Sequence, residues 1–180
     1  MSATKPLEGI KVIEISTIIT ASLSAMMLSD QGAEVIKIEQ TGFGDPLRYL
    51  GTQKGGISAI FANTNRGKRS VELDLKIESD LEQAKKLISE ADVLINNFRP
   101  GVMDSLGLGK EDCKTLNKDL IYVAITGFGK EGPYANAPAY DHVVQAMSGS
   151  TAIQADEDKP KYIKTLLCDK ITAYTATQSI

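Results

Sequence analysis

Short apolar runs and longer helical patterns alternate along the first part of the chain. Residues 10–15 and 33–39 are β-branched, mostly apolar runs of strand length. Between them, residues 21–31 carry apolar side chains at helical spacing, and Gly32 stands where this helix is expected to end. Two strands joined by a crossover helix lie parallel, and helices normally cover both faces of a parallel sheet. The pattern therefore predicts a doubly wound α/β fold.

The same alternation continues along the rest of the chain. Further strands are predicted at residues 71–75, 92–96 and 120–126. Further helices are predicted at residues 79–90, 102–106, 110–116, 138–149 and 170–180. Ser79 is the expected N-cap of the first of these helices. Strands that alternate with helices indicate a mostly parallel, Rossmann-like sheet.

Composition and charge exclude several classes of function. The 180 residues carry a net charge of −3, whereas a nucleic-acid-binding protein needs a basic surface. Residues 1–6 are polar, and no apolar run approaches the roughly 20 residues that a membrane span requires. Cys113 and Cys168 lie far apart and without metal-ligand spacing. We therefore expect a cytoplasmic protein with two reduced thiols, no bound metal, and no nucleic-acid or membrane partner.

Two turns after predicted strands bear on ligand binding. Residues 16–22 have hydroxyl side chains where a dinucleotide-binding turn has glycines, so NAD is not expected there. Residues 127–132 spell G-x-G-x-x-G, but Pro133 follows and no helix is predicted directly after it. We interpret this stretch as a glycine loop at the carboxyl end of a strand, where open α/β sheets bind ligands.

Residues 40–70 form a basic segment in an acidic chain. This segment has a local charge of +4, because it contains five cations and only one anion, Asp45. The cations are Arg48, Lys54, Arg66, Lys68 and Arg69. Arginine forks and lysine charges are the groups that bind phosphate at loops. The segment is therefore either a solvated basic loop or a phosphate site.

Seven segments together resemble the N-terminal part of a family III coenzyme A transferase. This family includes formyl-CoA:oxalate and carnitine CoA-transferases and the α-methylacyl-CoA racemases. The segments are residues 6–14, 32–39, 44–48, 65–74, 91–101, 127–133 and 140–149. Family members are more than twice as long, so the resemblance implies that residues 1–180 are an incomplete large, Rossmann-like domain. The second domain, the C-terminal return and an interlocked homodimer would belong to the full-length protein.

The resemblance also implies a nucleophile. In this family an aspartate near the start of a helix attacks the substrate, and the matching position is Asp169. A carboxylate can attack an acyl-CoA thioester to give a mixed anhydride, which the departed CoA thiolate recaptures as an aspartyl thioester. A helix N-terminus is expected to offset the rise in pKa that burial causes. Without the resemblance, Asp169 is more simply interpreted as a helix N-cap, and the two roles are compatible.

Tyr140 stands where the racemases of this family carry a histidine. Because tyrosine has a pKa near 10, it is poorly suited to proton transfer near neutral pH, which favours a transferase. His142 follows two residues later, about 200° around a helix, and is expected to be a structural or surface residue. Coenzyme A is implied as a substrate, with no permanently bound cofactor. Its expected contacts are Arg48, Arg66, Lys68, Arg69, Asn97, Arg99, Gly127 and Gly129.

Three departures from the family pattern concern the substrate. Residues 21–22 are Ala-Ser where Gly-Pro is usual, and Ile19 and Gln40 match a glutamine and an arginine of formyl-CoA transferases. Formate and oxalate are therefore not expected as substrates. An acyl-CoA racemase or isomerase and a non-catalytic CoA-binding fragment remain as alternatives. A cysteine hydrolase is disfavoured, because Asp169 would oppose ionisation of the neighbouring Cys168.

Overall fold

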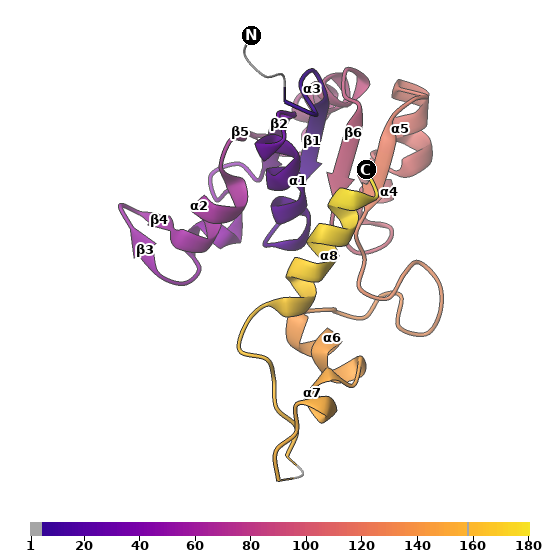
Figure 1. Ribbon diagram of the computed structural model, residues 1–180. Coiled ribbons are helices and arrows are strands. Elements are labelled where there is room, and N and C mark those ends of the chain that lie inside the picture. Colours follow the sequence, from indigo (N-terminus) through magenta and orange to yellow (C-terminus); the bar gives the residue numbers. More distant parts are fainter. Residues whose placement is uncertain (1–4, 158) are drawn as a thin grey trace.

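The protein is built on a five-stranded parallel sheet, seen in a computed structural model that describes residues 5–157 and 159–180 (Figure 1). The strand order is β5-β2-β1-β6-β7. The strands are β1 Lys11–Ile15, β2 Glu34–Glu39, β5 Arg69–Glu72, β6 Val93–Asn96 and β7 Ile121–Ala124. The chain fills one side of β1 and then crosses to the other side, which is the doubly wound, Rossmann-like order. The fold class predicted from the sequence is confirmed.

Helices cover both faces of this sheet because side chains alternate between the faces along each strand. Val12, Val35 and Val93 pack against helix α1, Thr20–Asp30. Ile13 and Leu94 pack on the opposite face. That face is covered by α3 Glu78–Ser89, α4 Val102–Ser105 and α5 Lys110–Leu116. The sheet is therefore buried on both sides, as the near-continuous apolar strands predict.

The remaining elements lie around this three-layer core. A small antiparallel hairpin, β3 Gln53–Lys54 and β4 Ile57–Ser58, projects beside the sheet with helix α2 Ala59–Asn65 and the 3₁₀ helix η1 Pro46–Tyr49 (Figure 1). Below the sheet in this view lie α6 Asp141–Met147 and α7 Ser150–Ile153. The last helix, α8 Leu167–Gln178, returns to pack on α1, where the Thr177 hydroxyl donates to Ser24 Oγ at 3.0 Å.

Three predicted helix starts differ from the structure. Ser79 is not the N-cap of α3, because the Leu81 amide donates to the Ile77 carbonyl and the helix begins one residue earlier. Helix α6 begins at Asp141 rather than at residues 138–139. Helix α8 begins at Leu167 rather than at residue 170.

In residues 5–157 and 159–180, no helix combines the length and apolar character needed to cross a membrane. The polar opening noted in the sequence falls mainly on residues 1–4, outside the described part.

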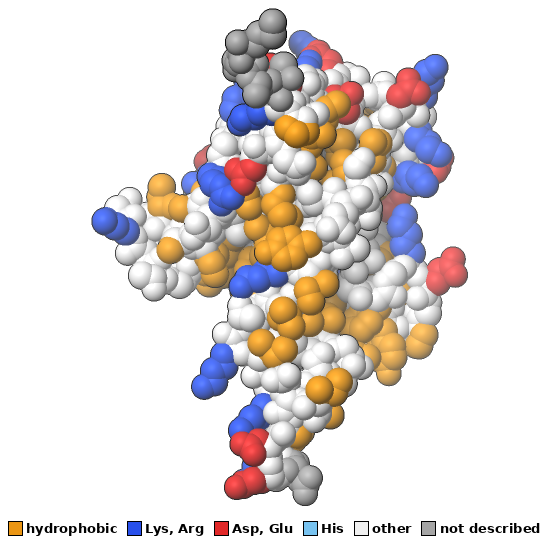
Figure 2. All heavy atoms as spheres, viewed as in Figure 1, with side chains coloured by type: hydrophobic (Ala, Val, Ile, Leu, Met, Phe, Trp, Pro, Cys, Tyr) orange, Lys and Arg blue, Asp and Glu red, His pale blue; other side chains and the backbone are white. Residues whose placement is uncertain are grey.

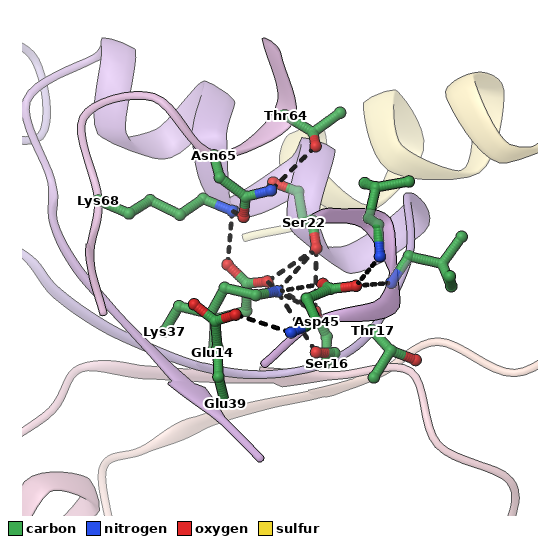
Figure 3. A network of polar contacts seen from close by, with 12 residues as sticks. Glu14, Ser16, Thr17, Ser22, Lys37, Glu39, Asp45, Thr64, Asn65 and Lys68 are labelled. Atoms are coloured by element: carbon green, nitrogen blue, oxygen red, sulfur yellow. Dashed lines mark hydrogen bonds and ion pairs between the residues drawn. The ribbon is translucent and has the colours of Figure 1, made fainter. Parts of the chain in front are cut away.

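Charged side chains interrupt the apolar pattern on the α1 face of the sheet (Figure 3). Glu14 on β1 and Lys37 on β2 are neighbours in the strand register, and both are fully buried. The Lys37 ammonium lies 2.5 Å from Glu14 Oε1 and 2.9 Å from Asp45 Oδ2. The Lys68 ammonium lies 2.6 Å from Glu14 Oε2. Two carboxylates and two ammonium groups therefore neutralise one another inside the protein.

Hydroxyl groups complete the hydrogen bonding of this buried network. The side chains of Ser16 and Ser22 donate to Glu14 Oε1 at 2.6 and 2.9 Å. Burial by itself raises the pKa of Glu14, but the Lys37 and Lys68 ammonium groups outweigh it and lower the pKa to about 2. Asp45 Oδ2 faces the Lys37 ammonium as an ion pair without a hydrogen bond, and the other described polar atoms of the network are hydrogen-bonded, which is the condition under which buried charges are tolerated.

Asp45 extends the network to the turn that follows β1. Its Oδ1 atom accepts hydrogen bonds from the backbone amides of Ile18, at 3.1 Å, and Leu47, at 2.8 Å. Ile18 has a φ of +66°, a left-handed conformation that β-branched residues rarely adopt. The buried charges thus hold the turn after β1 in a shape that its own sequence does not favour.

Replacing Lys37 with methionine is expected to destabilise the protein by about 3 to 5 kcal/mol, because it leaves buried carboxylates without their shared cation. The free energy of unfolding, measured by urea denaturation, tests this expectation. Lys11→Met is the matched control, since Lys11 is also a strand lysine paired with a glutamate but is exposed. The control is expected to change stability by about 0.5 kcal/mol or less. Equal effects of the two substitutions would contradict the role of the network.

Candidate active site

A cleft of about 350 Å³ opens at the carboxyl ends of β1, β6 and β7. Its walls come from the loops after these strands and from the segment that includes α6 and the start of α8. The lining residues fall in the ranges 17–20, 97–100, 125–127, 135–140, 144, 168–169 and 172. Strands β1 and β6 are the neighbours at which the order of the sheet reverses. Open α/β sheets bind ligands at this switch point, so the cleft lies where the fold predicts a site.

Asn97 holds two walls of the cleft together. Its Oδ1 atom accepts the Thr17 amide at 3.1 Å, and its Nδ2 atom donates to the Thr17 carbonyl at 2.7 Å and to Thr20 Oγ1 at 3.1 Å. These bonds join the loop after β6 to the turn after β1. The side-chain amide of Asn97 thus hydrogen-bonds to other residues of the protein, and these bonds fix the shape of the cleft.

Asp169 lies in the first turn of α8 and lines the cleft. Leu166 is the N-cap residue, so the interpretation of Asp169 as the cap is wrong: the Lys170 amide donates to the Leu166 carbonyl, and the helix starts before Asp169. Among the residues that the structure describes, no group donates a hydrogen bond to the Asp169 carboxylate. The carboxylate is therefore free to meet a ligand in the cleft.

The charge state of Asp169 reflects its surroundings. Burial raises the pKa of Asp169 to about 6, the Asp141 carboxylate adds to the rise, and His142 opposes it. The pKa thus lies above the ordinary value of 3.8 although Asp169 stands in the first turn of α8. At pH 7 such a carboxylate is about nine-tenths ionised, and it is more basic than an ordinary aspartate. A half-buried, mostly ionised and unusually basic carboxylate is suited to act as a nucleophile.

Three further predicted residues line the same cleft. Tyr140 immediately precedes α6 and is 68% exposed, and Arg99 is exposed in the loop after β6. Gly127 follows β7, and a Cβ atom at this position would overlap the Ala139 side chain. Glycine is therefore needed at position 127, where the loop after β7 passes close to Ala139 on the opposite wall of the cleft. Gly129 lies two residues further along the loop and does not line the cleft.

The four cations predicted to bind phosphate lie outside the cleft lining. Each of them has a carboxylate partner: the pairs are Arg48–Glu39, Arg66–Asp30, Lys68–Glu14 and Arg69–Glu34. The Lys68 side chain is only 2% exposed, so its burial favours a structural role over contact with a ligand. Arg66 and Arg69 are 51% and 65% exposed. The charge of +4 counted along the sequence is thus balanced in space by carboxylates from β1, β2 and α1.

Two further side chains, those of His142 and Cys168, lie near Asp169. His142 is exposed, as predicted, and its ring packs edge-on against Tyr162 with centroids 5.3 Å apart. Cys168 lines the cleft, but burial and the charges of Asp141 and Asp169 raise the pKa of its thiol. A thiol that resists ionisation is a poor nucleophile, which agrees with the preference for Asp169. No cluster of potential metal ligands occurs within residues 5–157 and 159–180.

Comparison with known proteins identifies the family of this chain. The model of CoA-transferase family III matches residues 7–180. The chain belongs to CoA-transferase family III. It is 43% identical over 155 residues to the acetyl-CoA:oxalate CoA-transferase of Acetobacter aceti, covering 86% of this chain and 40% of that protein. It is 38% identical over 183 residues to the succinate–glutarate CoA-transferase of Agrobacterium fabrum, covering 97% and 46%.

A solved structure of this family shows the same fold. The crystal structure of a CaiB/BaiF family protein from Brucella suis superposes with a TM-score of 0.93 at 37% identity. The match covers 98% of this chain and 48% of that protein. The resemblance drawn from the sequence motifs is confirmed. The chain spans less than half the length of the family III relatives that it matches.

Replacing Asp169 with asparagine is expected to stabilise the protein at neutral pH. Because the native pKa lies above the ordinary value of 3.8, the unfolded state binds fewer protons between about pH 4 and 6, and stability falls as pH rises through this range. The neutral amide removes this penalty. We expect a gain of about 1 kcal/mol at pH 8, reduced by solvent screening of the half-exposed group, and a gain that shrinks toward zero near pH 4.

Urea denaturation at several pH values measures this effect. Asp119→Asn, which replaces an exposed carboxylate, is the control and is expected to show no such pH dependence. If Asp169→Asn and the parent protein have the same free energy of unfolding at pH 8, the electrostatic account of the site is contradicted.

Proposed function

We propose that the full-length protein transfers coenzyme A from an acyl-CoA donor to a carboxylic acid acceptor, with Asp169 as the nucleophile. The observation that carries this proposal is the Asp169 carboxylate, free of hydrogen bonds from the described residues, in a cleft at the switch point of a family III sheet. The names of the relatives, which describe CoA transfer to oxalate and between succinate and glutarate, support it. Acyl-CoA is then a substrate rather than a bound cofactor.

The reaction follows from the chemistry of a carboxylate nucleophile. An Asp169 oxygen attacks the thioester carbonyl, and the C–S bond breaks to release CoA thiolate and leave a mixed anhydride. The thiolate then attacks the Asp169 carbonyl carbon, which releases the first acid and forms an aspartyl-CoA thioester. The acceptor carboxylate displaces CoA thiolate from this thioester to form a second anhydride. Thiolate attack on the acceptor's carbonyl gives the new acyl-CoA and restores the Asp169 carboxylate.

The lining of the cleft suggests how substrates would be held. Arg99 is exposed at the cleft and can pair with a carboxylate or phosphate oxygen. Gly127, with Gly129 beyond it, provides a loop whose backbone a ligand can approach closely, and Asn97 keeps the walls in register. Arg66 and Arg69 are the proposed phosphate contacts, because their exposed guanidinium groups can turn away from their partners, and Arg48, which is 30% exposed, is a further candidate.

Tyr140 favours a transferase over a racemase at this site. A racemase must deliver and remove a proton at the carbon next to the thioester, which needs a group that titrates near neutral pH. Tyr140 lines the cleft where the racemases carry histidine, while His142 packs on Tyr162 outside the lining. A transferase needs no second proton-transfer group, since each step exchanges one carboxylate or thiolate for another.

We also propose that this chain is one part of a larger catalytic unit. It spans 40–48% of the relatives compared above. Hydrophobic side chains gather over α8 and below it in Figure 2. The exposed residues of this region include Met147, Ile153, Tyr162, Ile171 and Tyr174. A second domain, a C-terminal return and an interlocked homodimer in the cytoplasm would cover such a surface, and residues 1–180 alone would lack transferase activity.

Trapping the covalent intermediate tests the mechanism. Incubation of the full-length protein with acyl-CoA, followed by hydroxylamine, is expected to convert the activated Asp169 carbonyl to a hydroxamate that mass spectrometry maps to this residue. Asp169→Ala is expected to lose at least about a thousandfold in kcat, because Asp169 is the carboxylate that the described residues place in the cleft lining.

The 180-residue chain is assayed beside the full-length protein, and Asp119→Ala serves as the control for a surface carboxylate. Turnover of the donor with an unmodified Asp169 and an active Asp169→Ala variant would refute the mechanism. Transfer at a comparable rate by the 180-residue chain alone would refute the proposal that a second domain completes the site.

The phosphate contacts are tested by CoA affinity. Each charge-assisted contact contributes roughly 1.5 to 3 kcal/mol, so Arg66→Ala and Arg69→Ala are each expected to weaken CoA binding about ten- to a hundredfold, and less at high salt. Lys114→Ala, which removes an exposed, ion-paired cation from α5, is the matched control. Calorimetry that finds equal affinity in all variants at low and high salt would show that these arginines only pair with their carboxylates.

A further inference from the structure

The N-terminus of α8 is capped by a residue of another helix. A cap residue normally accepts hydrogen bonds from the amides two or three positions later, but Leu166 has no acceptor in its side chain. Asp141, the first residue of α6, takes this place: its Oδ2 atom accepts the Cys168 amide at 2.7 Å and the Asp169 amide at 3.2 Å. The cap of the helix that carries Asp169 therefore comes from 28 positions earlier in the chain.

Gln145 holds Asp141 in this position from the next turn of α6. Both side chains are buried, at 0% and 3% exposure, and Gln145 Nε2 donates to Asp141 Oδ1 at 2.5 Å. Gln145 Oε1 accepts the Ile163 amide at 2.9 Å, and Nε2 also reaches the Thr165 carbonyl at 3.3 Å. Two residues of α6 thus fix both the segment that leads into α8 and the first turn of α8.

We propose that Asp141 is a positioning residue for the Asp169 carboxylate. Its carboxylate ties the first turn of α8 to α6 and occupies the amides that would otherwise stabilise the charge of Asp169. Its importance for turnover depends on the proposed CoA transfer, whereas its effect on Asp169 does not.

The arrangement makes Asp169 more basic for two reasons. The helix amides that normally lower the pKa of a nearby carboxylate are already engaged, and the negative charge of Asp141 opposes a second negative charge beside it. Among the described residues, the other titratable or charged groups next to Asp169 or in the cleft lining are His142 on α6, Cys168 and Lys170 on α8, and Tyr140 and Arg99 in the cleft walls. Helix α1 contributes Thr20 to the cleft and no charge.

Two variants separate the charge of Asp141 from its hydrogen bonds. Asp141→Asn and Asp141→Ser both keep an oxygen that can accept a helix amide, and both remove the charge. The full-length protein with ¹³C-labelled aspartate gives the titration midpoint of the Asp169 carboxyl by NMR, and the pH profile of kcat/KM gives its functional counterpart. Asp112→Asn is the matched control, because Asp112 accepts the Gly109 amide at the start of α5, away from the cleft.

We expect both Asp141 variants to lower the Asp169 midpoint by roughly half a pH unit or more and to move the acid limb of the profile by the same amount. We also expect a severalfold lower kcat at pH 8, because a less basic carboxylate is a weaker nucleophile. The control variant is expected to leave the midpoint and the profile unchanged. An unchanged Asp169 midpoint in the folded Asp141 variants would overturn the proposal.

Hydrogen exchange on the unsubstituted protein gives a check that does not depend on how the variants fold. The Cys168 and Asp169 amides are expected to be protected, whereas the first amides of an uncapped helix exchange freely. Free exchange at both amides would overturn the proposed cap. A midpoint that moves in a protein without CoA transfer would support the role of Asp141 and refute only the proposed function.

Discussion

The fold depends on one ion pair buried inside its sheet, between Glu14 and Lys37. The pair joins the two strands that start the parallel sheet, and it lies where apolar side chains would otherwise continue. Desolvating two charges costs several kcal/mol for each ion, so the pair is tolerated only because Lys68, Asp45 and the neighbouring hydroxyls satisfy it. Those partners come from the turn after β1, from the loop after β2 and from the segment that leads into β5. The same contacts that satisfy the charges therefore fix the loops.

The cleft inherits its shape from two separate sets of contacts. On the sheet side, Asp45 holds Ile18 in its left-handed conformation, and Asn97 fastens the adjoining turn to the loop after β6. On the other side, Asp141 and Gln145 hold the entry to α8. Helix α8 packs on α1, which starts at the same turn, so both sets meet across the cleft. Asp169 is thus placed relative to the sheet by elements far apart in sequence.

The sequence predicted the strands and helices of the core better than it predicted where the helices begin or which partners the charged side chains have. The five strands of the parallel sheet were predicted because buried parallel strands are apolar runs bounded by turns, whereas the short hairpin β3–β4 and helix α2 were not predicted. The start of α8 was missed because its cap acceptor, Asp141, lies on another helix, and no local pattern records that. The charge of the basic segment was counted without the carboxylates that pair with it, because these partners lie far away in the sequence: Glu14 is 54 positions from Lys68. The signal for the buried network was present: Glu14 and Lys37 occupy inward positions of apolar strands, where a charge needs an opposite charge.

The carboxylates of this protein fall into two groups with opposite effects of pH on stability. Glu14 and Glu39 have pKa values lowered from 4.5 to about 2 by their cations and hydrogen bonds, so the stability that they contribute is complete above about pH 4.5 and is lost as pH falls toward 2. Asp169 has a raised pKa of about 6, so it destabilises the fold at higher pH. Between about pH 4.5 and 6 the network is ionised while Asp169 is still mostly protonated. At neutral pH the satisfied carboxylates offset the one that is left without donors, and this allows a basic, unpaired carboxylate to persist at the cleft.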